Sequence, residues 1–183
     1  MKIGYLMQAG VPDIRERPYS GPANHVKHVF DELLGLGHEV RLVAQLDGEF
    51  WATDDLVTLR PISLAGPTEW IWRLAERTVR RIQGTLGLPY AAWFESRRFA
   101  RACRSELDGF HLLYERMGWM GYGGGLAAQR MDIPWVLEVN GDHLEELEAL
   151  GIAPKGGQKW LSMLVMRLAM RRVSHVVAAG EGW

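Results

Sequence analysis

The first forty residues constrain the fold most strongly, because they predict a strand, a small-residue elbow, a helix and a second strand. Residues 1–7 are a short apolar strand, and the helix that follows the elbow ends near Gly37, which suits a left-handed C-cap. Such a unit is half of a nucleotide-type α/β motif, and ligands bind at its elbow. The apolar residues of the helix have the spacing of a helix packed on a sheet, and they are Val26, Val29, Phe30, Leu33 and Leu34.

The elbow favours binding of a negatively charged group. Pro22 fits the first helical position because it has no N–H to lose there, and Gly21 lets the backbone approach a ligand. Free amides and the positive end of the helix dipole stabilise a phosphate or a carboxylate. We therefore predict a substrate-binding role for Ser20, Gly21, Pro22 and His25. The alternative, that Gly21 and Pro22 only start the helix, stays open.

The length and composition favour one domain over residues 1–183. A formal net charge of −1, with both signs well mixed, indicates no nucleic-acid partner. The single cysteine, Cys103, excludes an internal disulfide and a cysteine-based zinc site, and it favours a cytoplasmic setting. No apolar run reaches the roughly 20 residues of a membrane span, and we expect no signal peptide.

Strands and helices alternate along the rest of the chain, which predicts an α/β fold with a parallel sheet and helices on both faces. Ligands of such sheets bind beyond the carboxyl ends of the strands, so the strand exits are the candidate sites. We expect further strands over residues 39–44, 56–61, 110–114, 135–139 and 174–179, with a loop over 45–55. We expect further helices over residues 68–83, with Thr68 as N-cap, 91–107, 126–130 and 158–172.

Glu115 and Arg116 stand at the exit of one predicted strand. A carboxylate and a guanidinium are costly there unless they pair or meet a polar ligand. We predict that they bind hydroxyls or phosphate, and a structural pair is the alternative. The glycine-rich run 118–125 that follows lacks the G-x-G-x-x-G spacing of a dinucleotide site, so we expect close helix packing there.

The densest polar cluster of the chain begins at Asn140. Asn140 would face the crevice, and His143 could bind a hydroxyl or act as a base. We predict that Asn140 and His143 are catalytic and that Gly141 binds substrate. The alternative is a helix cap, in which Asp142 is the N-cap with Glu145 three residues on.

Two further patterns concern metals and membranes. His25 and His28 lie three residues apart without a third ligand, so we expect no metal site. Four arginines at helical spacing beside two tryptophans suit an anionic membrane surface, with an exposed basic face as the alternative. These residues are Arg73, Arg77, Arg80, Arg81, Trp70 and Trp72.

Together these motifs carry a family likeness that spans essentially all of the chain in the expected order. The chain resembles the N-terminal half of GT-B glycosyltransferases, specifically glycosyltransferase family 4. The likeness lies in residues 21–26, 35–40, 114–116, 133–140 and 174–179. It implies a Rossmann-like domain that binds the acceptor of a retaining, hexosyltransferase-type enzyme of carbohydrate biosynthesis, with a nucleotide sugar as the donor.

The resemblance also has implications for cofactors, substrate contacts and a partner domain. Family members need no cofactor or metal, because protein groups stabilise the leaving diphosphate. Gly21 and Pro22 would lie near the donor phosphates or the acceptor, and Asn140 falls where many members carry a histidine. The family's donor-binding domain lies outside these residues, so we expect the chain to be inactive alone and to need that domain in cis or in trans.

The acceptor and the setting stay open at this point. A small molecule, a glycan or a lipid-linked sugar would each fit, in the cytoplasm, with or without peripheral membrane contact. The competing interpretation is a non-catalytic binding or scaffolding module that keeps the same fold.

Overall fold

A computed structural model of the chain describes residues 1–8, 12–64, 69–88, 92–141, 143–149, 151 and 153–178. In that part of the chain, seven strands form one sheet in the order β4-β3-β2-β1-β5-β6-β7. The strands are β1 Lys2–Met7, β2 Glu39–Leu46, β3 Glu49–Thr53, β4 Arg60–Pro61, β5 Leu112–Arg116, β6 Trp135–Val139 and β7 His175–Ala178. The helices are α1 Gly21–Gly35, α2 Glu69–Thr85, α3 Trp93–Glu106, α4 Gly123–Met131, α5 His143–Ala149 and α6 Gly157–Met170.

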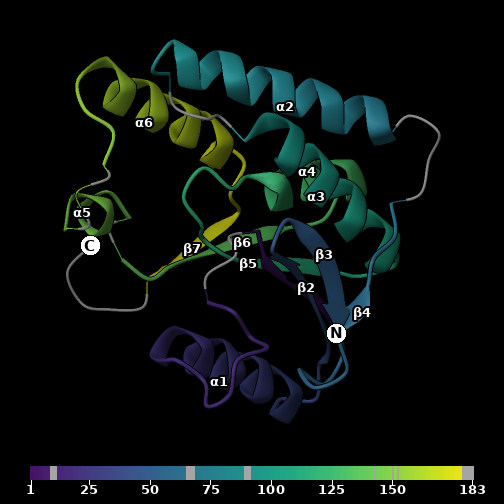
Figure 1. Cartoon of the computed structure of the whole chain (residues 1–183). Helices are drawn as coiled ribbons and strands as arrows, with labels where there is room; N and C mark the ends of the chain where they lie inside the picture. The colour runs from purple at the N-terminus through teal and green to yellow at the C-terminus, as the bar shows by residue number, and fades with distance from the viewer. Residues whose placement is uncertain are drawn as a thin grey trace.

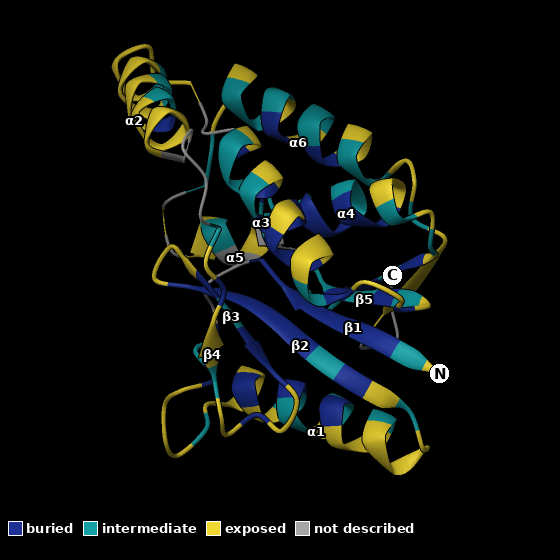
Figure 2. Cartoon of the chain, turned by 90° about the vertical axis from the view of Figure 1, so that its right-hand side faces the viewer, coloured by how far each residue is buried: buried dark blue, intermediate teal, exposed yellow. Residues whose placement is uncertain are grey.

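The predicted Rossmann-like fold is confirmed. β2, β1, β5, β6 and β7 pair in parallel, α1 covers one face of the sheet, and α3, α4 and α6 cover the other (Figures 1 and 2). The strand order reverses at β1, because β2 lies on one side of β1 and β5 on the other. A crevice is expected at such a reversal, beyond the carboxyl ends of the two strands.

Both faces of the sheet are buried, as the apolar strands require. Leu6 of β1 packs with Phe99 of α3 and with Trp135 of β6 on one side. Tyr5, the neighbouring residue, packs with Phe30 of α1 on the other side. Successive side chains of β1 therefore anchor helices on opposite faces, which fixes where α1 sits relative to the crevice.

The C-terminus of α1 confirms the predicted left-handed cap at Gly37, where φ is +79°. The N–H of Gly37 donates to the carbonyl of Leu34 at 2.9 Å, and the N–H of His38 donates to that of Leu33 at 3.2 Å. This is the Schellman arrangement, which satisfies the last carbonyls of a helix. The predicted cap at Thr68 lies outside the described residues.

The prediction of a loop over residues 45–55 was wrong. β2 continues to Leu46, and β3 pairs with it in antiparallel fashion through a turn at Asp47 and Gly48. Both turn residues have positive φ, at 52° and 78°, which is the geometry of a tight hairpin. The Asp-Gly dipeptide does form a turn, but the residues that follow it, Glu49–Thr53, pair with β2 as a strand.

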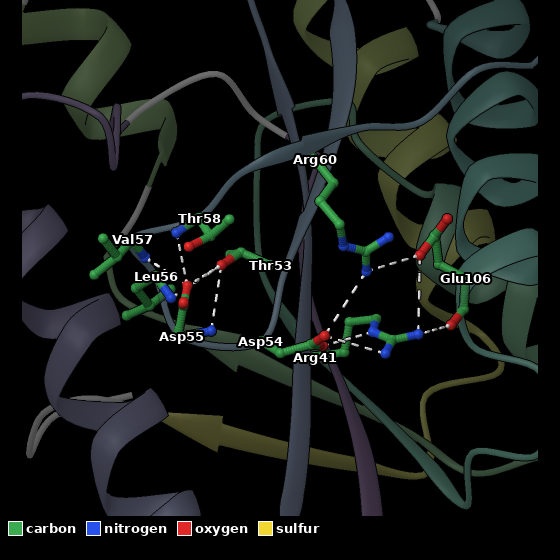
Figure 3. A network of polar contacts seen from close by, with 9 residues as sticks. All are labelled: Arg41, Thr53, Asp54, Asp55, Leu56, Val57, Thr58, Arg60 and Glu106. Carbon is green, nitrogen blue, oxygen red and sulfur yellow. Dashed lines mark hydrogen bonds and ion pairs between the residues drawn. The ribbon is translucent and has the colours of Figure 1, made fainter.

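The strand predicted over residues 56–61 is reduced to Arg60–Pro61, because the preceding segment is held as a turn (Figure 3). The carboxylate of Asp55 accepts the N–H groups of Val57 and Thr58 at 2.8 and 2.7 Å. The Thr53 hydroxyl accepts the N–H of Leu56 at 3.0 Å. These backbone bonds, with a bond from Thr53, lower the pKa of Asp55 to about 2.

A second group of contacts ties this edge of the sheet to α3. Arg41 of β2 donates to Asp54 at 2.6 Å and to the Glu106 carbonyl at 2.9 Å, and Arg60 donates to the Glu106 carboxylate at 3.3 Å (Figure 3). These contacts lie beside the antiparallel strands, so they support the fold away from the parallel strand exits.

Candidate functional site

The glycine-rich run after β5 packs closely, as predicted. A side chain at Gly124 would overlap the carboxylate of Glu115, and a Cβ at Gly125 would lie 2.6 Å from the ring of Trp135. The N–H of Gly123 donates to Gln8 at 2.6 Å. The first turn of α4 is therefore bonded to Gln8 and packed against the sheet, whereas the first residues of α1 are exposed.

Glu115 belongs to this packing and lies on the α4 face of the sheet. It is 2 % exposed, and burial raises its pKa to about 8, while the Gly124 N–H and the Trp135 indole act in the opposite direction. Successive strand residues point to opposite faces, so Arg116 lies on the α1 face. The structure does not bring Glu115 together with the other predicted substrate-binding residues, and its role in binding stays a prediction.

On the α1 face, three of the predicted site residues converge on one carboxylate. Glu138 of β6 is 1 % exposed. Its Oε1 atom accepts from His25 Nε2 at 2.9 Å, from Arg116 Nη1 at 3.4 Å and from Asn140 Nδ2. We call these four residues the Glu138 cluster. It joins α1, β5 and the exit of β6 at the reversal of strand order.

The sequence explains how these side chains meet. His25 lies in the first turns of α1, Arg116 ends β5, and Asn140 follows β6 by one residue. Asn140 and Glu138 are two residues apart and so share a face of the strand. Because the parallel strands end at one edge, their last side chains gather beside the start of α1.

Two tyrosines lie under the Glu138 cluster. The rings of Tyr5 and Tyr114 meet edge to face, with 5.4 Å between their centroids. Burial raises the pKa of both hydroxyls, and the negative charge of Glu138 raises it further. Among the described residues, Glu138 Oε2 and the Tyr5 hydroxyl have no hydrogen-bond partner. Glu138 Oε2 thus keeps acceptor capacity beside the three donors that bond Oε1.

The N-terminus of α1 opens beside this cluster. Ser20 is the N-cap, and its hydroxyl accepts the N–H of Ala23 at 3.4 Å. The helix begins at Gly21, so the prediction of Pro22 at the first helical position was wrong by one residue, since Ser20 already provides the cap. Ser20, Gly21 and Pro22 are exposed, and among the described residues no atom beyond the neighbouring residues and the backbone of α1 lies within 4 Å of a Cβ built on Gly21. The elbow therefore has space for a ligand.

Of the remaining predicted site residues, the structure describes Gly141 but not the side chain of His143. Gly141 is half-buried beside Asn140. His143 is the first residue of α5, but its side chain lies outside the described part of the structure, as does Asp142. The predicted catalytic role of His143 and the predicted cap at Asp142 both stay predictions.

Glu138 is the residue of this site that sequence reasoning missed. It stands in the apolar run Trp135–Val139, and a carboxylate inside such a strand is costly unless it is paired. That contrast with its neighbours was the available signal. Its partners could not be read locally, because His25 lies 113 residues away.

Two other features, a metal-binding cluster and a membrane-spanning helix, are absent from the described residues. No group of three or more His, Cys, Asp or Glu side chains among them could hold a metal ion. No helix in this part of the chain is both long enough and apolar enough to span a bilayer.

Comparison with known families agrees with the architecture. Residues 20–183 match the family described as glycosyl transferase 4-like domain, so the match includes the α1 elbow and every member of the Glu138 cluster. None of the curated proteins compared with the chain matches it. Because the family match covers most of the sequence, the chain belongs to the glycosyl transferase 4-like domain family. It is a glycosyltransferase-type module, and its fold is that of a Rossmann-like GT-B half.

Proposed function

We propose that this domain holds the acceptor for a retaining hexosyl transfer from a nucleotide sugar. The observation that carries the proposal is the convergence of His25, Arg116 and Asn140 on the buried carboxylate of Glu138, at the reversal of strand order. A charged carboxylate held with such partners gives a fixed arrangement of donors and acceptors, which suits the hydroxyls of a sugar.

Each member of the Glu138 cluster has a separate part in this proposal. When His25 Nε2–H donates to Glu138, the Nδ1 atom keeps a lone pair that can accept from an acceptor hydroxyl. Arg116 has guanidinium N–H groups beyond the one that bonds Glu138, and these can donate to sugar oxygens. Asn140 adds an amide whose oxygen is an acceptor. Glu138 acts as the positioning residue that orients all three.

The start of α1 supplies the complementary charge. Ser20, Gly21 and Pro22 are exposed at the positive end of a helix dipole, which favours the phosphates of the donor or an anionic acceptor. In this proposal a second Rossmann-like domain, in cis or in trans, holds the nucleotide, and protein groups rather than a metal stabilise the leaving diphosphate.

Saturation-transfer NMR of the 183-residue chain with methyl and p-nitrophenyl hexosides tests the proposed acceptor site. His25→Ala should weaken binding of the preferred hexoside by about tenfold, because a hydrogen bond near a charged group contributes about 1.5 kcal/mol. Glu138→Gln should weaken it as well, since the amide does not hold His25 and Arg116 as a carboxylate does.

His28→Ala is the matched control, because His28 lies one turn further along α1 and is exposed. It should leave hexoside binding unchanged. If no hexoside binds, or if the two histidine variants behave alike, the acceptor site is wrong and a scaffolding role gains support.

A further inference from the structure

Helix α2 carries large apolar side chains on its outer surface. Trp70 is 66 % exposed, Leu74 is 55 % exposed, and Ile71 and Ile82 are each about half exposed. Figure 2 shows α2 as a largely exposed helix at the margin of the molecule. Ile71, Leu74 and Ile82 fall on one side of the helix at helical spacing. The helix therefore presents an apolar stripe, which we call the α2 stripe and define as Trp70, Ile71, Leu74 and Ile82.

The opposite side of α2 is fastened to the domain, so the α2 stripe faces away from it. Glu76 is 7 % exposed and pairs with Arg80 at 2.9 Å and with Arg98 of α3 at 3.4 Å. Trp72 packs against Trp93 and Phe94, with ring centroids 6.1 and 5.9 Å apart. These contacts fix the rotation of α2 about its own axis, so the α2 stripe faces away from the domain.

Basic residues accompany this stripe. α2 and α3 together hold eight arginines against four glutamates, although the whole chain has a net charge of −1. Arg77 and Arg81 lie on the exposed part of α2, at helical spacing from Trp70 and Leu74. Positive charge is thus concentrated on the pair of helices that carries the exposed apolar residues.

A cavity between α2 and α3 adds a place for an anionic group. It has a volume of about 280 Å³ and is lined by Trp72, Phe94, Arg97, Arg98 and Arg101. The guanidinium of Arg97 stacks on Trp93, 4.6 Å from the ring centroid. Guanidinium groups match phosphate oxygens in geometry and charge. The cavity therefore suits an anionic group, but Trp72 belongs to the side of α2 that contacts α3, so the cavity is separate from the α2 stripe.

We propose that α2 binds the surface of an anionic phospholipid bilayer, with the α2 stripe in the interface and the arginines on lipid phosphates. Tryptophan beside aliphatic residues and flanking arginine is the composition of an interfacial helix. In Figure 2, β1 runs from the N-terminus towards the side where α2 lies. If the proposed acceptor function is right, the bilayer would then lie near the strand exits and could present a lipid-linked acceptor.

Vesicle flotation of the 183-residue chain tests the proposed bilayer contact. The chain should float with vesicles of three parts phosphatidylcholine to one part phosphatidylglycerol, should float poorly with phosphatidylcholine alone, and should be released by salt. Trp70→Ser with Leu74→Ser should reduce binding by more than tenfold, because two apolar side chains stay in water. Arg77→Gln with Arg81→Gln should reduce it about fivefold per arginine.

Leu36→Ser and Val57→Ser are the matched controls, because these residues are 70 % and 75 % exposed but lie outside α2. Both should float like the parent chain, and circular dichroism should show the same helix content in every variant. Equal losses in controls and α2 variants, or no preference for anionic vesicles, would overturn the proposal.

Light scattering without lipid tests the alternative that a second copy of the chain covers the α2 stripe. A dimer that disappears in the Trp70→Ser, Leu74→Ser variant would also overturn the proposal, because a second copy would then cover the stripe. Failure of hexoside binding would leave this result unaffected, so the two proposals can fail separately.

Discussion

The two buried glutamates of the strand exits differ in what surrounds them. Glu138 accepts from three side chains and lies on the α1 face, whereas Glu115 lies against the backbone of α4 on the other face. Burial without a cationic partner favours the neutral acid. Glu115 therefore has a structural role and favours its neutral, protonated form, whereas Glu138 holds three polar side chains around its carboxylate.

Replacing Glu115 should change how stability depends on pH. Its pKa is about 8 in the folded chain and near the ordinary value of 4.5 when unfolded. Between these values the unfolded chain releases the proton and the folded chain keeps it, so the stabilisation present below pH 4.5 is lost as the pH rises to 8. Glu115→Gln should remove this loss, and its unfolding free energy relative to the parent chain should increase from pH 5 to pH 8.

Urea unfolding at both pH values measures this difference. Glu32→Gln is the control, because Glu32 is exposed on α1, and its stability difference from the parent chain should be the same at both pH values. A constant difference for Glu115→Gln as well would show that Glu115 titrates normally in the folded chain.

Local sequence signals selected three residues that the structure brings together, although their roles in binding and catalysis stay predictions. Ser20, His25, Arg116 and Asn140 were selected because they follow strands or begin a helix, and the structure places the last three in one cluster. Glu138 escaped selection because its neighbours are apolar and its partners are distant in sequence. The adjacency of Glu115 and Arg116 predicts a shared site, but adjacent strand residues face opposite sides of the sheet.

At the scale of elements, the glycines of α4 determine how closely this helix approaches the sheet. Gly124→Ala would bring a methyl group into the Glu115 carboxylate. We expect this variant to lose about 1–3 kcal/mol of unfolding free energy, as overpacked cores do. Thermal or urea unfolding measures the loss.

Gly84→Ala in α2 is the matched control, because in the described part of the chain no atom beyond its neighbours and the backbone of α2 lies within 4 Å of a Cβ at Gly84. That variant should gain about 0.5–1 kcal/mol, since alanine favours a helix over glycine. Equal effects at the two positions would contradict the packing role assigned to the run at the start of α4.

Element boundaries were predicted well where one pattern filled the whole element. β6 has the predicted bounds, and α6 differs from its prediction by one residue at the start and two at the end. β3 was missed because its five residues lie between two turn signals, and only pairing with β2 identifies it as a strand. Antiparallel pairing at the edge of a sheet depends on tertiary contacts more than on local propensity.

At the scale of the whole molecule, the proposed acceptor role predicts that residues 1–183 depend on a donor domain in cis or in trans. The purified 183-residue chain should show no sugar transfer from UDP-glucose or GDP-mannose to the hexoside it binds best. It should also show no measurable heat of binding for either nucleotide sugar in calorimetry. Transfer by this chain alone, measured by mass spectrometry of the products, would contradict this prediction.

The Glu138 cluster also has a consequence for how the domain folds. Its contact between α1 and β6 closes a loop of 113 residues, and the conformational entropy lost in closing that loop must be offset by the rest of the fold. A ligand that binds the cluster would therefore recognise the completed sheet and not the unfolded chain. By mass action, about 100 times its Kd of such a ligand should stabilise the entire domain by about 2.7 kcal/mol, so a melting curve can report occupancy of the site.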